Sequence, residues 1–309
     1  MTTPAPFDAR SLLCIPADAE RFFPKAADRG ADLILLDLED GVAPSAKAQA
    51  RAALPRAVAS LHARGALVYV RVNNEPALLS DDVLATVRSG ADGIMMPKVE
   101  TPQELSRLDA AIASAEQASE RQAHGVRIVA LIETPSGVCR AVDIARASTR
   151  LVSMGLGAED FATAMGIEPS MEALSGPAQM VAIAAVAAGL HPIGLPGPVG
   201  DFVDLDAYRG VAERGRMLGI RGAVCIHPAQ VQVLNEVFGG SDTQLAQAQH
   251  VVSAFDAALA AGKGAIALDG RMIDAPIANR ARLFLARKRG SSMPNPAAVG
   301  EAASGATTS

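Results

Sequence analysis

The stretch DLILLDLED, residues 32–40, is an almost unbroken apolar run that ends in acidic residues. Nearly continuous runs of this kind are typical of parallel strands that are covered on both faces. Residues with a helical period near 3.6 follow it, before the next apolar run begins at Leu67. This alternation of apolar runs with helical stretches predicts βαβ units and a parallel sheet.

The same alternation recurs along most of the chain. Eight apolar runs are predicted to be strands: residues 12–16, 32–38, 67–72, 93–97, 127–132, 151–156, 190–195 and 222–226. Right-handed crossovers would close such a series into a barrel. We therefore predict an α/β fold, a (β/α)8 TIM barrel formed by residues 10–240.

The segments outside the barrel have other patterns. Ser241 and Gln244 form a capping-box signature that opens a helix, and residues 241–289 are predicted to be a helical C-terminal extension and lid. Residues 290–309 are small, polar and aperiodic. We expect this tail and residues 1–9 to be disordered.

Composition and charge exclude several classes of protein. Half of the 309 residues are hydrophobic and 20% are charged, which is typical of a globular protein. The formal net charge is −5 and the basic residues are scattered, so we expect neither a nucleic acid nor a membrane as partner. With no apolar stretch long enough for a signal peptide or a membrane span, a cytoplasmic protein is expected. Cys14, Cys139 and Cys225 lack CxxC spacing and are predicted to be buried, reduced thiols.

Charged residues follow the predicted strands directly, where a (β/α) barrel carries its reactive groups. These residues are Asp37, Glu39, Asp40, Arg71, Lys98, Glu133, Glu159 and Asp160. Carboxylates that converge on one mouth repel each other unless a cation lies between them, and oxygen ligands suit Mg²⁺ or Mn²⁺. Mg²⁺ takes one or two protein carboxylates, and Glu133 and Asp160 are the predicted pair.

Most of these residues also have a structural interpretation. The acids after the second strand could be helix N-caps, and Arg71 could neutralise them rather than bind substrate. Lys98 could be a solvated charge at a helix start or a ligand contact, and His227 is interpreted as a hydrogen-bonded structural residue. Gly155 and Gly157 form no nucleotide-binding motif, but could expose backbone N–H groups to a carboxylate.

Seven segments together resemble a known family. They are ERFFPKAADRGADLILLDLEDGVAP, VYVRVN, ADGIMMPKVE, ALIETPSGV, SMGLGAEDFATAMGI, AVCIHPAQVQVLNEVF and LDGRMIDAP. Residues 10–287 resemble the HpcH/HpaI aldolase and citrate lyase β-subunit family, and within it the CitE-like proteins that include malyl-CoA, citramalyl-CoA and citryl-CoA lyases.

The resemblance implies roles for residues at the barrel mouth. Glu133 and Asp160 match the magnesium ligands, with Mn²⁺ as an alternative cation. Arg71 matches the arginine that binds the oxo or hydroxy acid, and Glu133 is expected to contribute to the same substrate site. Glu39 and Asp40 match catalytic acids that hold metal-bound water.

Further implied roles lie outside this group. Arg21 and Lys25 fall where related lyases present basic residues to the phosphates of CoA, which enters as part of the substrate. Asp274 matches a catalytic aspartate on a lid that reaches a neighbouring subunit's active site. The resemblance therefore implies a homo-oligomer, a trimer or a hexamer.

The implied activity is Mg²⁺-dependent cleavage or formation of a carbon-carbon bond in a 3-hydroxy-dicarboxylyl-CoA, giving acetyl-CoA and a 2-oxo acid. Alternatives are the β subunit of a multi-subunit citrate lyase acting on citryl-acyl-carrier protein, a malyl-CoA-type thioesterase, and a CoA-binding protein without turnover. Residues 193–202, IGLPGPVGDF, and 171–180, MEALSGPAQM, depart from the family pattern, so the acyl group stays open.

Overall fold

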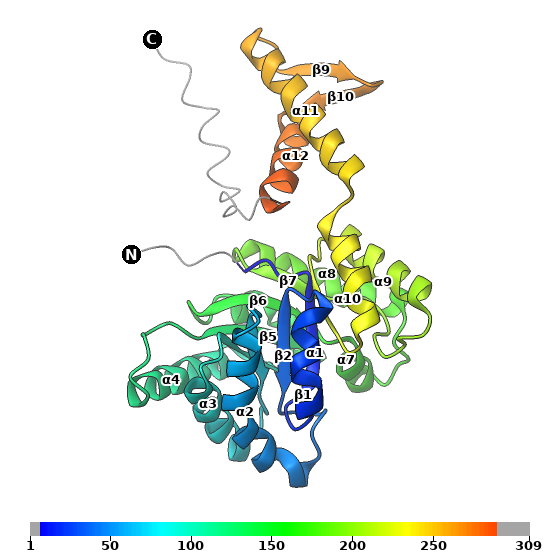
Figure 1. The fold of residues 1–309 in the computed structure, drawn as a ribbon. Helices are drawn as coiled ribbons and strands as arrows, with labels where there is room; N and C mark the ends of the chain where they lie inside the picture. Colours follow the sequence, from blue (N-terminus) through cyan, green and yellow to red (C-terminus); the bar gives the residue numbers. More distant parts are fainter. Residues whose placement is uncertain (1–6, 289–309) are drawn as a thin grey trace. The chain divides into compact units, whose positions relative to one another are not determined.

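Eight parallel strands form the central barrel of the protein (Figure 1). The computed structural model describes residues 7–288. The strands are β1 (Ser11–Pro16), β2 (Leu33–Asp37), β3 (Val68–Arg71), β4 (Gly93–Met96), β5 (Arg127–Ile132), β6 (Leu151–Leu156), β7 (His191–Gly194) and β8 (Ala223–Cys225). Their hydrogen-bonded order is β7-β6-β5-β4-β3-β2-β1-β8, and a parallel bridge between Ile193 and Gly222 joins the two edges. The predicted (β/α)8 barrel is confirmed.

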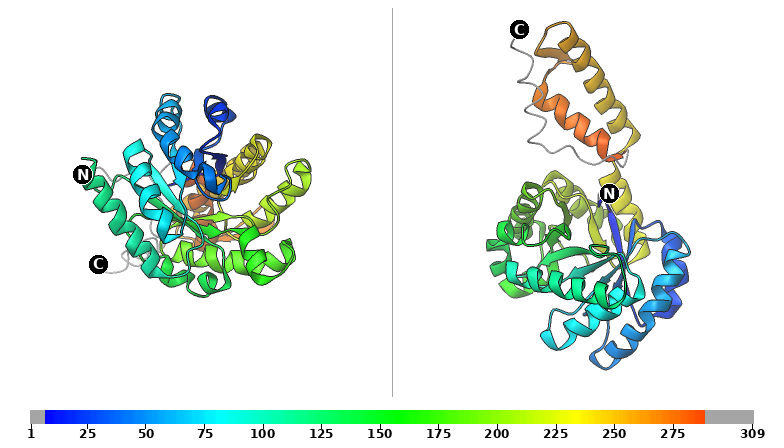
Figure 2. Two further views of the ribbon diagram at one scale, coloured as in Figure 1. Left: turned by 90° about the horizontal axis from the view of Figure 1, so that it is seen from below. Right: turned by 90° about the vertical axis from the view of Figure 1, so that its left-hand side faces the viewer.

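Helices surround the strands on the outside of the barrel, as the end-on view in Figure 2 shows. The longer ones are α2 (Lys47–His62), α3 (Pro76–Ser89), α4 (Pro102–Ala118), α7 (Ala158–Met165), α8 (Met171–Ala187), α9 (Leu205–Met217) and α10 (Pro228–Gly239). The shorter ones are η1 (Glu20–Phe22), α1 (Phe23–Ala26), η2 (Ala27–Arg29), η3 (Pro44–Ala46), α5 (Pro135–Cys139) and α6 (Ala141–Ile144).

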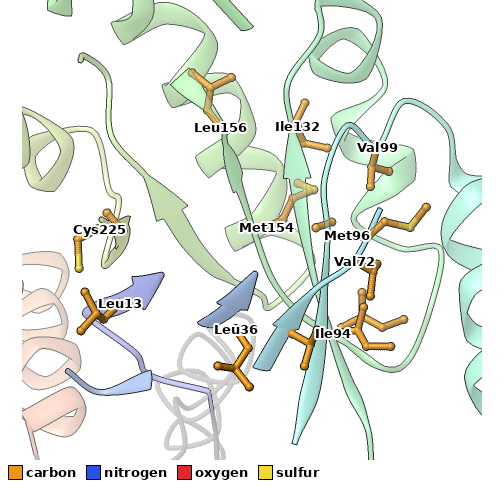
Figure 3. Close-up of a cluster of buried hydrophobic side chains, with 14 of the residues drawn as sticks. Leu13, Leu36, Val72, Ile94, Met96, Val99, Ile132, Met154, Leu156 and Cys225 are labelled. Atoms are coloured by element: carbon orange, nitrogen blue, oxygen red, sulfur yellow. The ribbon is translucent and has the colours of Figure 1, made fainter. Parts of the chain in front are cut away.

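The barrel strands bury aliphatic and sulfur-containing side chains in one large cluster (Figure 3). All five residues of β2 are buried, which explains why its sequence shows no polar alternation. Complete burial of a Leu or Ile side chain contributes about 1.5–3 kcal/mol to stability. Cys225 belongs to this cluster, whereas Cys139 at the end of α5 is exposed. The prediction that every cysteine is buried was therefore wrong for Cys139.

The chain divides into two compact units, of which Ala9–Phe238 contains the barrel. The other unit contains α11 (Asp242–Ala260), a hairpin of β9 (Ala265–Leu268) and β10 (Arg271–Asp274), and α12 (Ala275–Lys288). The Ser241 capping box at the start of α11 is present as predicted. The hairpin was missed, because the prediction described this extension as helical.

Two predicted segments fall mostly beyond the described part of the chain. Residues 1–6 and 289–309, where disorder was predicted, lie outside the described residues. Between residues 7 and 288, no helix is both long and apolar enough to cross a membrane.

Gly155 in β6 is expected to be essential for barrel closure. A Cβ at this position would lie 2.2 Å from the backbone oxygen of Ile193, its partner residue in β7. Gly155→Ala should therefore lower the free energy of unfolding by about 3 kcal/mol, measured by urea denaturation. Gly210→Ala in α9 is the control, since no atom lies within 4 Å of its Cβ position. It should raise stability by up to about 1 kcal/mol, and equal effects of the two changes would contradict this interpretation.

Candidate active site at the carboxyl ends of the strands

The carboxyl ends of β2 to β6 bring acidic and basic side chains together. Asp37 ends β2 and pairs in register with Arg71, which ends β3. Lys98 follows β4, Glu133 follows β5 directly, and Asp160 lies in the first turn of α7 after β6. The barrel topology thus assembles residues from five successive strands into one mouth, as the sequence predicted.

Arg71 forms ion pairs with two of the acids. Its Nε and Nη2 donate to Oδ1 and Oδ2 of Asp37 at 2.8 and 2.7 Å, and its Nη1 lies 3.1 Å from Oε2 of Glu39. Burial would lower the pKa of Arg71, but the hydrogen bonds to Asp37 raise it, so the guanidinium stays charged. The interpretation that Arg71 neutralises these acids is confirmed, and its contact with substrate stays a prediction.

Asp37 also orders the loop that follows β2. Its carboxylate accepts hydrogen bonds from the backbone N–H groups of Glu39 and Gly41 at 2.9 and 2.8 Å. Burial alone would raise the pKa of Asp37, but the bonds from Arg71 and from these two N–H groups hold it below its ordinary value. Asp37 therefore orders a turn of the loop, and its interpretation as a helix N-cap was wrong, because the next helix, η3, has Ala43 at its N-cap position. In contrast, Glu39 is buried beside Arg71 and Asp40 is exposed.

Glu133 is a buried carboxyl group, with 3% of the residue exposed. Burial, followed by the negative charges of Asp160 and Glu39, raises its pKa from 4.5 to about 7. A Cβ at Gly157 would lie 2.3 Å from Oε1 of Glu133, so the glycine leaves room for this carboxylate. The Gly157 N–H bonds to the Ile132 carbonyl at 3.0 Å, so the expectation that it faces a carboxylate was wrong.

Lys98 is a central residue of the mouth that the predicted set of functional residues did not include. Its Nζ lies 2.7 Å from Glu39 Oε1, 3.3 Å from Asp40 Oδ2 and 3.8 Å from Asp160 Oδ1. Its backbone N–H donates to Glu133 Oε2 at 2.7 Å. The interpretation of Lys98 as only a solvated charge is therefore wrong. Its place directly after a strand was the one available sequence signal.

The donor set at the mouth fits a hard divalent cation. Of the five carboxylates here, those of Asp37, Glu39, Asp40 and Asp160 form ion pairs with Arg71 or Lys98. The fifth, that of Glu133, accepts a hydrogen bond from the Lys98 N–H. Among residues 7–288, no cluster of three or more His, Cys, Asp and Glu residues is arranged to hold a metal. Mg²⁺ commonly takes only one or two protein carboxylates and fills its remaining positions with water and substrate, and Glu133 and Asp160 would be such a pair.

A pocket of about 520 Å³ beside β1 and α1 has a largely apolar lining that also carries basic residues. Arg21 and Lys25, the predicted CoA-phosphate residues, both line it, and Arg29 adds a basic residue that the prediction missed. Cys14 lines the same pocket, and burial together with the charge of Asp37 raises the pKa of its thiol to about 12. Pro16 also lines the pocket and pairs in register with Asp37, so the pocket adjoins the carboxylates at the barrel mouth.

His227 also lines this pocket, and it has structural contacts there. Its ring stacks on that of Phe202 with 4.7 Å between the centroids, and its Nδ1 accepts from the Ala229 N–H at 3.2 Å. These contacts agree with its interpretation as a hydrogen-bonded structural histidine. The stacking also holds Phe202, in the Pro- and Gly-rich segment after β7, against His227 in the pocket wall.

Asp274 belongs to the unit that follows the barrel. It is the last residue of β10, and its Oδ1 accepts a hydrogen bond from the Ile277 N–H at 3.2 Å. The side chain thus caps the first turn of α12. Its catalytic role stays a prediction.

Known proteins are similar to this chain in sequence and in fold. The model of the HpcH/HpaI aldolase/citrate lyase family matches residues 10–228. The chain belongs to this family. One relative, the L-malyl-CoA/beta-methylmalyl-CoA lyase of Cereibacter sphaeroides, is 36% identical over 288 residues, covering 86% of this chain and 90% of its own. The citrate lyase subunit beta of Escherichia coli is 32% identical over 285 residues, covering 90% and 92%.

A solved structure from the same family supports the assignment. The CitE protein of Mycobacterium tuberculosis, in complex with magnesium, acetoacetate and coenzyme A, superposes with a TM-score of 0.72 at 28% identity. The match covers 91% of this chain and 98% of that one. Together with the relatives named as lyases, this family membership identifies the protein as a lyase.

Proposed function

We propose that this family member is a Mg²⁺-dependent lyase that cleaves or forms a carbon-carbon bond in a 3-hydroxy-dicarboxylyl-CoA, such as malyl-, citramalyl- or citryl-CoA. The observation that carries the proposal is that the pocket holding Arg21, Lys25 and Arg29 extends to Pro16 of β1, the residue paired in register with Asp37 of the carboxylate site. Carboxylates on one side suit a divalent cation, and basic residues on the other suit the phosphates of a CoA thioester. The names of the relatives support the same substrate class.

The proposed mechanism assigns one task to each residue. When bound by Glu133 and Asp160, Mg²⁺ would supply a Lewis acid for the oxygen atoms of the substrate acid. Arg71, held in its charged form by Asp37, binds the substrate carboxylate. When the carbon-carbon bond breaks, the 3-hydroxyl becomes the carbonyl of the 2-oxo acid and gives its proton to water held by Glu39 and Asp40, while Asp274 donates a proton to the α-carbon of the thioester fragment. The reverse condensation runs both proton transfers backwards.

The remaining residues bind and position. Arg21, Lys25 and Arg29 bind the CoA phosphates from their common pocket. Glu39 and Asp40 hold water in the carboxylate site, and Lys98 connects both of them to Asp160. The chain is further proposed to work as a homo-oligomer in which the Asp274 lid of one subunit serves its neighbour.

Product analysis tests the proposed reaction. The purified protein is incubated with malyl-, citramalyl- and citryl-CoA, with Mg²⁺ and with EDTA, and the products are separated by liquid chromatography. Acetyl-CoA together with glyoxylate, pyruvate or oxaloacetate, formed only with Mg²⁺, is the expected result. Free hydroxy acid together with CoA would contradict the proposal and indicate a thioesterase. CoA binding without any product would indicate a binding protein without catalytic activity.

The similarity to a citrate lyase β subunit favours one further candidate, an enzyme that acts on citryl-acyl-carrier protein. The basic pocket argues for free CoA, because three arginine and lysine side chains suit the several phosphates of CoA. A comparison of kcat/KM for citryl-CoA and for citryl-acyl-carrier protein decides between them. A much higher value for the carrier-bound substrate would favour the subunit role.

The raised pKa of Glu133 predicts a pH-dependent metal affinity. With a pKa of about 7 in the metal-free protein, this carboxyl must lose a proton before it can bind Mg²⁺. Below pH 7, Mg²⁺ affinity measured by calorimetry should fall by about tenfold per pH unit, with one proton released for each ion bound. An affinity that stays constant between pH 5.5 and pH 8 would contradict the assignment of Glu133 as a ligand.

The same shift predicts how the stability of the metal-free protein depends on pH. Because the pKa of Glu133 is higher in the folded than in the unfolded chain, the folded state binds the additional proton between pH 4.5 and 7. The contribution of Glu133 to stability is therefore largest below pH 4.5 and is lost as the pH rises through 7. Above pH 7 the ionised, buried group should cost about 3 kcal/mol, which bound Mg²⁺ would offset.

A further inference from the structure

Lys98 places a positive charge among the acids of the candidate metal site. Its Nζ lies between Glu39, Asp40 and Asp160, at 2.7, 3.3 and 3.8 Å from their nearest oxygens. The proposed mechanism uses the ammonium group for no bond-making or bond-breaking step. Its position therefore needs a different explanation.

The backbone of Lys98 is strained in a way that serves this position. Its φ of 54° lies in the left-handed region, which residues with a Cβ rarely adopt. In this conformation the N–H reaches Glu133 Oε2 at 2.7 Å, and the carbonyl accepts from Asn74 Nδ2 at 2.9 Å. One residue thus contacts both predicted metal ligands, Glu133 through its backbone and Asp160 through its side chain.

We propose that Lys98 is a positioning residue whose ammonium group holds the carboxylates together without metal and competes with the divalent cation for them. This inference rests on the proposed function, because it requires a metal at Glu133 and Asp160. Two positive groups a few ångströms apart repel each other, so a bound cation must either displace the ammonium group or tolerate it nearby. In both cases Lys98 weakens metal binding, and it sets the Mg²⁺ concentration at which the protein is loaded.

Substitutions of Lys98 separate these effects. Lys98→Met removes the charge and keeps the side-chain length. Lys98→Gly removes the charge and relieves the strained backbone, so the proposal can still be tested if the methionine variant fails to fold. Lys98→Arg keeps a positive charge. Lys263→Met is the control, since Lys263 is an exposed lysine outside the barrel unit.

Calorimetric titration with Mg²⁺ at pH 8, without substrate, is the main measurement. Lys98→Met and Lys98→Gly should bind Mg²⁺ about tenfold more tightly than the unchanged protein. Lys98→Arg and Lys263→Met should bind Mg²⁺ as the unchanged protein does. In EDTA, Lys98→Met should melt about 5 °C lower than the unchanged protein, because the carboxylates then repel each other without compensation. Saturating Mg²⁺ should remove this difference.

The outcomes distinguish the inference from the proposed function. Equal or weaker Mg²⁺ binding by both neutral variants would overturn the competition by Lys98 and leave the metal site itself intact. No binding by any of the proteins would overturn the metal site, and with it the inference.

Discussion

Replacing Glu133 with glutamine should abolish measurable Mg²⁺ binding and lower kcat/KM by at least about a thousandfold. A neutral amide is a poor ligand for a hard cation, although it has nearly the same shape as the carboxylate. Glutamine can still accept the hydrogen bond from the Lys98 N–H, and its side chain fits the space that Gly157 leaves for Glu133. The expected loss is therefore chemical and leaves the fold in place.

The same substitution should stabilise the metal-free protein. At pH 8 the buried, ionised Glu133 is destabilising, and glutamine removes that charge. Urea denaturation in EDTA should show Glu133→Gln to be more stable than the unchanged protein by up to about 3 kcal/mol at pH 8, and by much less at pH 5. Glu213→Gln, on the exposed side of α9, is the control and should change neither quantity. Normal Mg²⁺ affinity in Glu133→Gln would disprove its role as a ligand.

The barrel could be predicted from the sequence because its signals are local. Each strand is a short apolar run, and polar residues directly after a run mark the mouth of the barrel. The ranges 127–132 and 151–156 were predicted with the bounds that β5 and β6 have in the structure. The acids of the mouth could be named for the same reason, since their position relative to a strand is a property of the sequence alone.

The hairpin of β9 and β10 was missed although a local signal exists. Asp269 and Gly270 both have positive φ values, 49° and 73°, which is the geometry of the two-residue turns that Asp-Gly favours. The alternating residues of AIAL and RMID on either side were interpreted as part of a helical extension. The apolar residues of so short a segment fit both the helical period and the alternation of a strand. The Asp-Gly turn residues should have decided in favour of a hairpin.

Other features of the site could not be predicted because they depend on distances in space. The requirement for glycine at position 157 follows from the carboxylate of Glu133, 24 positions earlier, resting against it. Arg29 joins the basic pocket only because α1 and η2 fold back beside β1. The contacts of Lys98, through its side chain and its backbone N–H, likewise join acids that follow β2, β5 and β6.

Replacing Asp274 with asparagine should lower kcat by about a thousandfold while leaving stability and Mg²⁺ affinity unchanged. Asparagine caps a helix about as well as aspartate, so the hydrogen bond from the Ile277 N–H to residue 274 is retained. It cannot transfer a proton, however. Asp274→Ala removes both properties and should cost about 1 kcal/mol of stability in addition to activity. Full turnover by Asp274→Asn would show that Asp274 acts only as a helix cap.

A mixture of two inactive variants tests whether the lid acts on a neighbouring subunit. Glu133→Gln subunits keep an intact lid, and Asp274→Asn subunits keep an intact carboxylate site. If each lid serves the next subunit, random mixed oligomers made by co-expression combine an intact lid with an intact site in about a quarter of all positions. They should then show about a quarter of the original activity. If each lid serves its own subunit, no position is complete, and the mixture stays inactive like its parents.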